Sequence, residues 1–416
     1  MTAHILSIGD ELLIGQVINS NQAFIAQRLN AVGIAVDRMT TVGDDISLIV
    51  RSFREAMAQA DVVITTGGLG PTHDDVTRRA VCDFFETGLV RDEEAYQNVR
   101  RIFAHRGRPV LAVNEEQALV PQGCTVIQNA HGTAPGYFFS REGKIFAVLP
   151  GVPHEMEAMM EHFIVPYFQA KSTGRAILHK TLLTTGIAES TLAHELGPIE
   201  DYFSASDGVS LAFLPSTLGV RLRISARAVS PDAAQVLLSR VEQAIRAKAE
   251  KYIFGTDAER LEEIVGRILK ERKLAIAVAE SCTGGLILDR LTDIPGSSDY
   301  LERGFVTYSN RSKIEQLGVR RETLDQAGAV SNEVAQAMAT GARKTAGTDI
   351  GLSTTGIAGP GGATATKPVG TLWIGYADQD GAFAMKFLLE TDRRRFKMRA
   401  SQAALELLRR RLLKLD

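Results

Sequence analysis

The apolar positions of the first 170 residues follow two periods in turn. Short apolar runs predict buried strands, and apolar residues repeated every three to four positions predict amphipathic helices. The predicted strands are 4–9, 34–42 and 61–68, and the predicted helices are 21–33 and 45–60. Strands that alternate with helices imply right-handed βαβ crossovers and a mostly parallel sheet. We therefore predict an α/β domain over residues 1–170.

The pattern changes after this domain. Residues 171–255 run in the order strand, helix, hairpin and long helix, which predicts a small α+β module. The module is KH-like but lacks a basic G-x-x-G loop, so we expect a spacer or dimerisation role and no nucleic-acid partner. Residues 256–416 return to an α/β pattern. Their closing helix, 393–413, is rich in arginine, which we interpret as a solvated face.

Composition and charge narrow the class of protein. The chain has 416 residues, with 47 basic and 49 acidic side chains and a formal charge of −2. Such a balance offers no strong field for nucleic acid or a membrane surface, and no uncharged apolar run is long enough to cross a bilayer. The three cysteines match neither a disulfide framework nor zinc-ligand spacing. We expect a soluble, cytoplasmic protein.

A glycine-rich turn follows the apolar run 273–280. The turn reads Ser-Cys-Thr-Gly-Gly over residues 281–285 and leads into a predicted helix. Backbone N–H groups at such a turn can stabilise an oxyanion or hold a phosphate, which makes Thr283, Gly284 and Gly285 candidate substrate-binding residues. The alternative is a tight turn in which Ser281 only caps the helix. The pattern alone does not decide between these two interpretations.

The distribution of histidine limits the chemistry at this turn. The last of the eight histidines is His194, so the segment 256–416 has none of its own. A Ser-His-Asp or Cys-His arrangement within that segment is therefore excluded, and a serine nucleophile would need lysine or tyrosine instead. Tyr308 and Lys313 are the candidates. On residue pattern alone, an ordinary rim tyrosine and an exposed lysine are the simpler interpretation.

A second glycine-rich segment lies at 353–370. Its exposed backbone would suit a phosphate, a ribose or an amide carbonyl, and a flexible surface loop is the alternative. The spacing matches neither a Walker A motif nor a dinucleotide fingerprint. The glycines that we select as candidate ligand contacts are Gly356, Gly359, Gly361 and Gly362.

The first domain carries another candidate site. The stretch 64–80 runs on from the end of the third strand, and its candidate ligand contacts are Gly67, Gly68, Gly70 and Thr72. The carboxylate pairs Asp10–Glu11 and Asp74–Asp75 can hold a hard divalent ion such as Mg, Mn or Co, and Asp10, Asp74 and Asp75 are the ligands that we select. Because the carboxyl ends of parallel strands face one crevice, we expect a phosphorylated ligand bridged through metal. Helix capping by the aspartates is the alternative.

Several long motifs in order resemble the CinA (competence- and damage-inducible) family over essentially the whole chain. The first domain is similar to the molybdopterin-binding fold through GDELLIGQVINSN, TTGGLGPTHDDVT and LPGVPHEM. The last domain resembles the family's nicotinamide-nucleotide amidase domain through AESCTGGL, VTYSNRSKIEQLGV, GIAGPGG and KPVGT.

The resemblance implies deamidation of nicotinamide mononucleotide to nicotinic acid mononucleotide and ammonia, without a cofactor at the amidase site. It assigns Ser281 as nucleophile, Tyr308 and Lys313 as its proton-handling partners, and Arg393 with the 356–362 loop as nucleotide contacts. It also implies a metal-dependent ADP-ribose pyrophosphatase in the first domain and a homodimer. A non-enzymatic pterin-binding or competence-related protein remains the alternative, because a fold alone does not establish an activity.

This chain departs from the family pattern in loops. Ala363 stands where a third glycine is common, Thr391 where glycine often precedes Asp-Arg, and Arg311-Ser312 where Glu-Ala is common. The proposed catalytic positions are intact, so these changes bear on loop shape more than on activity.

Overall fold

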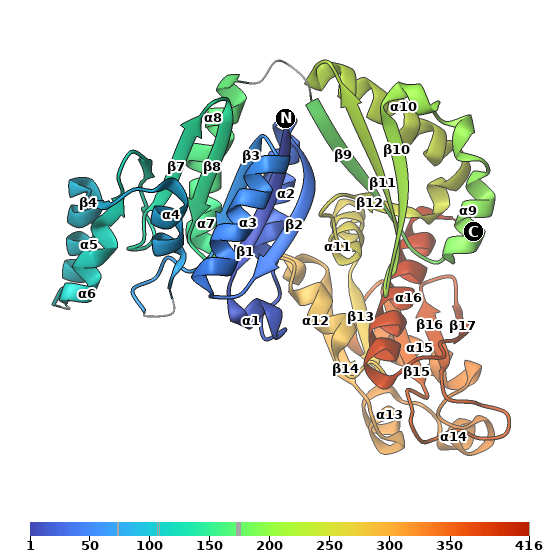
Figure 1. Cartoon of the computed structure of the whole chain (residues 1–416). Coiled ribbons are helices and arrows are strands. Elements are labelled where there is room, and N and C mark those ends of the chain that lie inside the picture. Colours follow the sequence, from blue (N-terminus) through green and yellow to red (C-terminus); the bar gives the residue numbers. More distant parts are fainter. Residues whose placement is uncertain (73–74, 106, 108, 172–175, 416) are drawn as a thin grey trace. The chain divides into compact units, whose positions relative to one another are not determined.

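The computed structural model describes residues 1–72, 75–105, 107, 109–171 and 176–415. It contains two compact units, which are Met1–Leu178 with Ala226–Leu237, and His179–Ser225 with Leu238–Asp416 (Figure 1). None of the helices in the described ranges combines the length and the apolar character that a membrane-spanning helix needs.

The first unit is built around a six-stranded sheet of order β2-β1-β3-β8-β7-β6. The strands are β1 Thr2–Ile8, β2 Ala35–Val42, β3 Val62–Thr66, β6 Thr125–Ile127, β7 Gly136–Arg141 and β8 Lys144–Leu149. The pairs β2-β1, β1-β3 and β3-β8 are parallel, which confirms the predicted mostly parallel sheet. β7 and β8 form an antiparallel hairpin that we did not predict. Its two loop residues, Glu142 and Gly143, both have positive φ angles, as tight hairpin turns require.

Helices cover both faces of this sheet. Alternate residues of β1 enter separate cores, with Ala3 and Ile5 on one face and Leu6 and Ile8 on the other. A strand buried on both faces reads as a continuous apolar run, which is why the sequence pattern located it. The helices are α1 Asp10–Leu13, α2 Ser20–Ala31, α3 Ile46–Gln59, α4 Thr77–Phe85, α5 Glu93–His105, α6 Ala112–Glu115, α7 Pro153–Met159 and α8 Val165–Lys171. A short ladder joins β4 Leu89–Arg91 to β5 Leu119–Pro121.

The middle module has a four-stranded sheet of order β10-β11-β9-β12. Its strands are β9 Ala176–Thr184, β10 Val209–Ser216, β11 Gly219–Ala228 and β12 Ile253–Thr256, and its α-helices are α9 Glu189–Leu196 and α10 Pro231–Ala249. The Ser230 hydroxyl accepts a hydrogen bond from the Ala233 N–H, 3.2 Å away, and Pro231 is the first helical residue. This start of α10 is the one that the Ser-Pro dipeptide predicts.

The last domain has a five-stranded sheet of order β14-β13-β15-β16-β17. Its strands are β13 Ile276–Glu280, β14 Leu301–Val306, β15 Ile350–Gly356, β16 Thr371–Ala377 and β17 Ala382–Leu388. β14, β13 and β15 are parallel, whereas β16 and β17 pair antiparallel. The helices are α11 Leu261–Arg272, α12 Leu286–Thr292, α13 Asn310–Leu317, α14 Arg321–Ala327, α15 Asn332–Ala346 and α16 Arg393–Leu413. Helices α11, α12 and α16 pack on one face, and α13, α14 and α15 on the other.

Helix α16 exposes most of its arginines, as predicted, but its other face buries charged side chains. Gln402, Glu406 and Arg409 are each less than 5% exposed. The Arg409 guanidinium pairs with Glu406 at 2.7 Å and donates to the carbonyl oxygens of Lys251 and Ile253. The predicted solvated face is confirmed for Arg393, Arg394, Arg395, Arg399 and Arg411, which are exposed, but it does not extend to Arg409. A long helix can bury a charged residue where it finds a partner, and composition does not show that partner.

Candidate functional site

The turn 281–285 lies at the carboxyl end of β13, between two parallel neighbours. Ser281 directly follows the strand, is 9% exposed, and its N–H donates to the Thr354 carbonyl of β15 at 3.0 Å. Gly284 and Gly285 have φ angles of 60° and 95°, which side chains other than glycine rarely adopt. The two glycines therefore allow the chain to turn sharply into α12 while Ser281 stays at the strand end.

Lys313 reaches Ser281 from the neighbouring helix α13. Its Nζ donates to the Ser281 Oγ at 3.1 Å and to the Thr307 carbonyl at 2.7 Å. The side chain is 1% exposed, and no ion pair joins it to any described residue. Burial lowers the pKa of Lys313 from 10.5 to about 8, because water no longer solvates the ammonium. A lysine with such a pKa can accept a proton near neutral pH.

Glu280 holds the turn and was missed in the sequence. Its side chain is fully buried, and its carboxylate accepts from the N–H groups of Gly285 and Leu288 at 2.9 and 2.8 Å. Its carbonyl accepts from the Thr307 N–H at 2.8 Å. Glu280 thus ties the start of α12 to the segment that carries the carbonyl partner of Lys313. The sequence did contain a sign of this role, because a glutamate at the end of a buried apolar strand needs hydrogen-bond donors for its carboxylate.

The side chains of the two residues after Ser281 are buried and support the fold of the turn. Cys282 is 7% exposed, and burial raises the pKa of its thiol to about 12, so little thiolate forms. The Thr283 side chain is fully buried and shares a hydrogen bond with the Thr354 hydroxyl at 2.7 Å. Any contact of Thr283 with substrate would therefore involve its backbone. Of the two candidate nucleophiles at the turn, only Ser281 has a base within hydrogen-bond distance.

Backbone N–H groups of the turn are free to meet a negative charge. The N–H of Gly285 is bonded to Glu280, but those of Cys282, Thr283 and Gly284 donate to no other described residue. Unpaired N–H groups beside a nucleophile can stabilise the oxyanion that forms when a carbonyl is attacked.

The side chains of Tyr308 and Arg393 contact each other, and neither forms a hydrogen bond with the Ser281 hydroxyl among the described contacts. Tyr308 is 63% exposed, and its hydroxyl accepts from an Arg393 Nη at 2.8 Å. The other Arg393 Nη donates to the Gly359 carbonyl at 2.9 Å. Arg393 therefore connects the rim tyrosine to the glycine-rich loop 357–370, where Gly361 has open space around its α-carbon.

Close contacts at Gly356 and Gly284 show different roles for these two glycines. A Cβ at Gly356 would press on the Phe396 ring and the Cys282 sulfur, at 3.1 and 3.2 Å, so Gly356 serves packing. A Cβ at Gly284 would lie 3.4 Å from the Lys397 Nζ, which places a second cation next to the turn. Lys397 lies one turn after Arg393 on α16, and sequence analysis missed it within the basic run.

The first unit contains a cavity of about 410 Å³ at the carboxyl ends of β1 and β3. The predicted residues Gly67, Gly68 and Gly70 line it. A Cβ at Gly67 would collide with the Ile8 carbonyl and one at Gly68 with the Thr77 hydroxyl, so the loop backbone approaches β1 closely. Thr72 is not among the lining residues, and its N–H donates to the Asp75 carboxylate at 2.9 Å.

The predicted metal ligands are only partly brought together. Asp75 lines the cavity, as do Glu11 and Glu155, which we did not select. Asp10 is not a lining residue, and its carboxylate accepts from the Asp44 N–H at 3.3 Å. Asp74 lies outside the described residues. Within the described ranges, no three His, Cys, Asp or Glu side chains gather in a group that could hold a metal.

Comparisons with known proteins cover all three parts of the chain. Three family models match it, which are the probable molybdopterin binding domain over residues 4–170, the damage-inducible protein CinA KH domain over 179–255 and the CinA C-terminal domain over 258–412. These matches confirm the predicted fold class of a molybdopterin-binding-like domain, a KH-like module and a C-terminal α/β domain.

Individual relatives match over the full length. A CinA-like protein of Chloroherpeton thalassium is 48% identical over 98% of this chain and 99% of its own. A putative competence-damage inducible protein of Caldicellulosiruptor saccharolyticus is 43% identical over 99% and 100%. The solved structure of the competence/damage inducible protein CihA from Agrobacterium tumefaciens is 40% identical over 36% of this chain and 93% of its own, with a TM-score of 0.35.

Proposed function

This chain belongs to the CinA family, and from that premise we propose that it is a hydrolytic amidase with Ser281 as nucleophile. The proposed substrate is nicotinamide mononucleotide, and the products are nicotinic acid mononucleotide and ammonia. The observation that carries the proposal is the hydrogen bond of 3.1 Å between the Lys313 Nζ and the Ser281 Oγ. A hydroxyl next to a buried amine of lowered pKa is the arrangement that acyl transfer without histidine requires.

The first half-reaction forms an acyl-enzyme. Neutral Lys313 takes the proton of the Ser281 hydroxyl while the oxygen attacks the carboxamide carbon. The carbonyl oxygen becomes an oxyanion, which the free N–H groups of Cys282, Thr283 and Gly284 can stabilise. Lys313 then gives its proton to the amide nitrogen, the carbon–nitrogen bond breaks, and ammonia leaves.

The second half-reaction restores the enzyme. Water attacks the ester carbon at Ser281 while neutral Lys313 accepts a proton from that water. The ester bond breaks, Lys313 returns a proton to the Ser281 oxygen, and the carboxylate product is released. Lysine thus cycles between its neutral and protonated forms twice per turnover, which its pKa of about 8 allows near neutral pH.

The phosphate end of the nucleotide would meet the cationic side of the turn. Arg393 and Lys397 lie one turn apart on α16, and Lys397 lies close to Gly284. Arg393 also bonds Tyr308 and the Gly359 carbonyl, so the arginine could orient both the loop and the phosphate. We assign Tyr308 to substrate positioning, because its hydroxyl bonds Arg393.

The test compares the two adjacent turn residues. Purified full-length Ser281→Ala should lose ammonia release from nicotinamide mononucleotide by about 10³-fold or more, because no acyl-enzyme can form. Cys282→Ala is the matched control and should stay within about tenfold of wild type, since it only removes a buried sulfur. Retained activity in Ser281→Ala together with loss in Cys282→Ala would overturn the assignment.

A second function is supported by the cavity of about 410 Å³ in the first unit. We propose that the first unit cleaves the phosphoanhydride of ADP-ribose in this cavity, which gives AMP and ribose phosphate. The glycine-rich loop allows a pyrophosphate close to the backbone. Glu11, Asp75 and Glu155 line the cavity without gathering in one ion-binding group, so a divalent ion would have to be shared between one carboxylate, such as that of Asp75, and the phosphate oxygens. A bound Mg, Mn or Co ion would supply positive charge to the phosphate oxygens.

The two proposed activities can be separated by experiment. Asp75→Ala should abolish AMP formation from ADP-ribose and leave ammonia release unchanged. EDTA should act in the same selective way, and AMP release that resists EDTA would refute the metal proposal. Binding of either ligand without any turnover would favour the non-enzymatic, pterin-binding alternative. We also propose a cytoplasmic homodimer, and a monomer in analytical ultracentrifugation would refute that part.

A further inference from the structure

A large cavity lies in the second unit, and Ser281 is not among the residues that line it. Its volume is about 1150 Å³, and its walls come from the loop after β9, the β10–β11 turn, strand β17 and helix α16. Neither Ser281, Lys313, Tyr308 nor Arg393 lines it. Small-molecule sites usually have about 300–1,000 Å³, so this cavity has room for a complete ligand.

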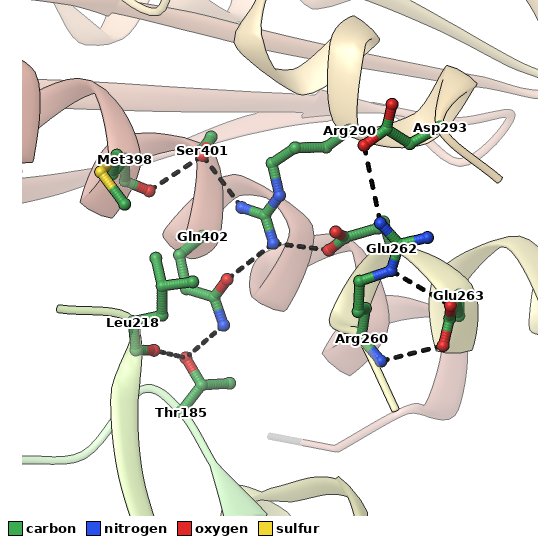
Figure 2. A network of polar contacts seen from close by, with 10 residues as sticks. All are labelled: Thr185, Leu218, Arg260, Glu262, Glu263, Arg290, Asp293, Met398, Ser401 and Gln402. Atoms are coloured by element: carbon green, nitrogen blue, oxygen red, sulfur yellow. Dashed lines mark hydrogen bonds and ion pairs between the residues drawn. The ribbon is translucent and has the colours of Figure 1, made fainter. Parts of the chain in front are cut away.

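One wall is held by a continuous polar network, shown in Figure 2. The Arg290 guanidinium donates to Glu262 at 2.7 Å, to the Ser401 hydroxyl at 2.9 Å and to the Gln402 amide oxygen at 2.8 Å. The Gln402 amide nitrogen then donates to the hydroxyl of Thr185 in the middle module at 3.2 Å.

The network continues to the hairpin turn. The Thr185 hydroxyl donates to the Leu218 carbonyl at 3.2 Å (Figure 2). Thr185 and Gln402 are less than 5% exposed, and both line the cavity. Because buried hydrogen-bonded residues keep one conformation, this wall is formed before any ligand binds.

A second wall is an apolar row on strand β17. Phe383, Met385, Phe387 and Leu389 all line the cavity, and their alternate positions put their side chains on one face of the strand. Met385 remains 44% exposed, and Leu218 on the hairpin turn is 37% exposed. An aromatic ring placed here would remove the apolar surface of Met385 and Leu218 from water. The Phe383 ring already has the Arg411 guanidinium 4.8 Å from its centroid, so Phe387 is the ring left for stacking.

Helix α16 adds positive charge along the same cavity. The charged lining residues are four arginines and two glutamates, namely Arg395, Arg399, Arg410, Arg411, Glu189 and Glu406. Glu406 is already paired with the buried Arg409 at 2.7 Å. Arg399 is exposed and forms no ion pair with any described residue. Arg395 pairs with Asp392 at 3.4 Å, Arg410 lies 4.0 Å from Glu406, and Arg411 lies over the Phe383 ring. Arg399 is therefore the lining cation that offers an anionic ligand its charge, and arginine is the preferred phosphate partner.

We propose that this cavity is a binding site for a nucleotide, with the base against the β17 row and the phosphate at the α16 arginines. An acyl chain with an anionic head would use only the apolar wall, whereas the hydroxyl, amide and guanidinium groups of the other walls favour a nucleotide. The site is separate from both proposed catalytic sites, and it does not depend on either activity.

Photolabelling of the full-length protein with 8-azido-AMP tests the proposal and locates the bound base. Mass spectrometry should find labelled residues within 383–389 or 215–220, and excess AMP should suppress that labelling. Arg399→Glu should reduce it by about tenfold or more, because a charge-assisted contact is replaced by repulsion. Leu218→Glu is a second variant, at an exposed position that lines the cavity, and it should also reduce the labelling.

The matched control is Arg321→Glu, an exposed helical arginine outside the cavity that makes the same change in net charge. It should leave the labelling unchanged. The proposal is overturned if neither segment is labelled, or if Arg399→Glu and Arg321→Glu behave alike. Suppression by dodecanoate but not by AMP would also overturn it, because the site would then accept an acyl chain.

Discussion

Lys313→Met should abolish amidase activity. Near neutral pH it should also cost less free energy of unfolding than a usual core substitution does, because it removes a buried charge. Lys313 is 1% exposed, and its pKa falls from 10.5 to about 8 because burial disfavours the ammonium. At pH 7 the folded protein therefore carries a poorly solvated charge. Methionine has a similar unbranched shape without that charge.

The magnitude follows from the two pKa values. The pKa of Lys313 is near 10.4 in the unfolded chain and about 8 in the folded protein, so the unfolded state binds more protons between these pH values. Stability of the wild type consequently rises with pH across this window. The charge costs about 3 kcal/mol at pH 7 and less than about 1 kcal/mol at pH 10. Loss of the hydrogen bond to the Thr307 carbonyl costs the variant about 1–3 kcal/mol at either pH.

Urea unfolding at pH 7 and pH 10 measures the difference. Trp373, the only tryptophan of the chain, lies on β16 and reports on the domain that holds Lys313. The stability of Lys313→Met relative to wild type should fall by about 2.5 kcal/mol between the two pH values. Lys344→Met, an exposed helical control, should show no such change. A relative stability that is equal at both pH values, or higher at pH 10, would refute the buried-lysine argument.

Further expectations concern catalysis and stability separately. The kcat/KM for ammonia release should rise with pH and level off above about pH 8, because Lys313 must be neutral to act as base; a flat profile from pH 6 to 9 would contradict this role. Tyr308→Phe should raise KM more than it lowers kcat, since the Tyr308 hydroxyl bonds Arg393; steady-state kinetics would show the opposite if the hydroxyl served as the base. Native protein should react slowly with iodoacetamide at Cys282, because burial raises the pKa of that thiol to about 12; peptide mapping with rapid labelling there would count against the structure. Arg409→Met should destabilise the second unit by about 3–5 kcal/mol by leaving Glu406 buried without its partner; in thermal unfolding, adding Glu406→Leu should recover most of the loss.

The secondary structure of the parallel sheets was predictable because buried strands and amphipathic helices differ in period. β1, β3 and β13 appear as short apolar runs, and the Ser-Pro start of α10 was visible as a cap. The β7–β8 hairpin was missed, because its turn uses Glu142 rather than a usual turn residue at the first loop position.

The candidate site was also predictable only in part from the sequence. The absence of histidine after residue 194 reduced the possible bases for Ser281 to Lys313 and Tyr308. Only the structure separates these two, because it buries Lys313 against Ser281 and leaves Tyr308 63% exposed beside Arg393. Glu280 was invisible as a functional residue, since its two donors come from the following turn and helix.

The sequence by itself determined which local elements form and which chemical groups they carry, because period, capping and residue type are local properties. The tertiary structure decided which of those groups are buried, and burial sets their chemistry. It lowers the pKa of Lys313 and raises that of Cys282, two residues 31 positions apart in the chain. It also buries one face of the basic helix α16, where Gln402 and Arg409 contact the middle module. Such effects depend on which distant segments exclude water from a side chain, and the order of residues does not state that.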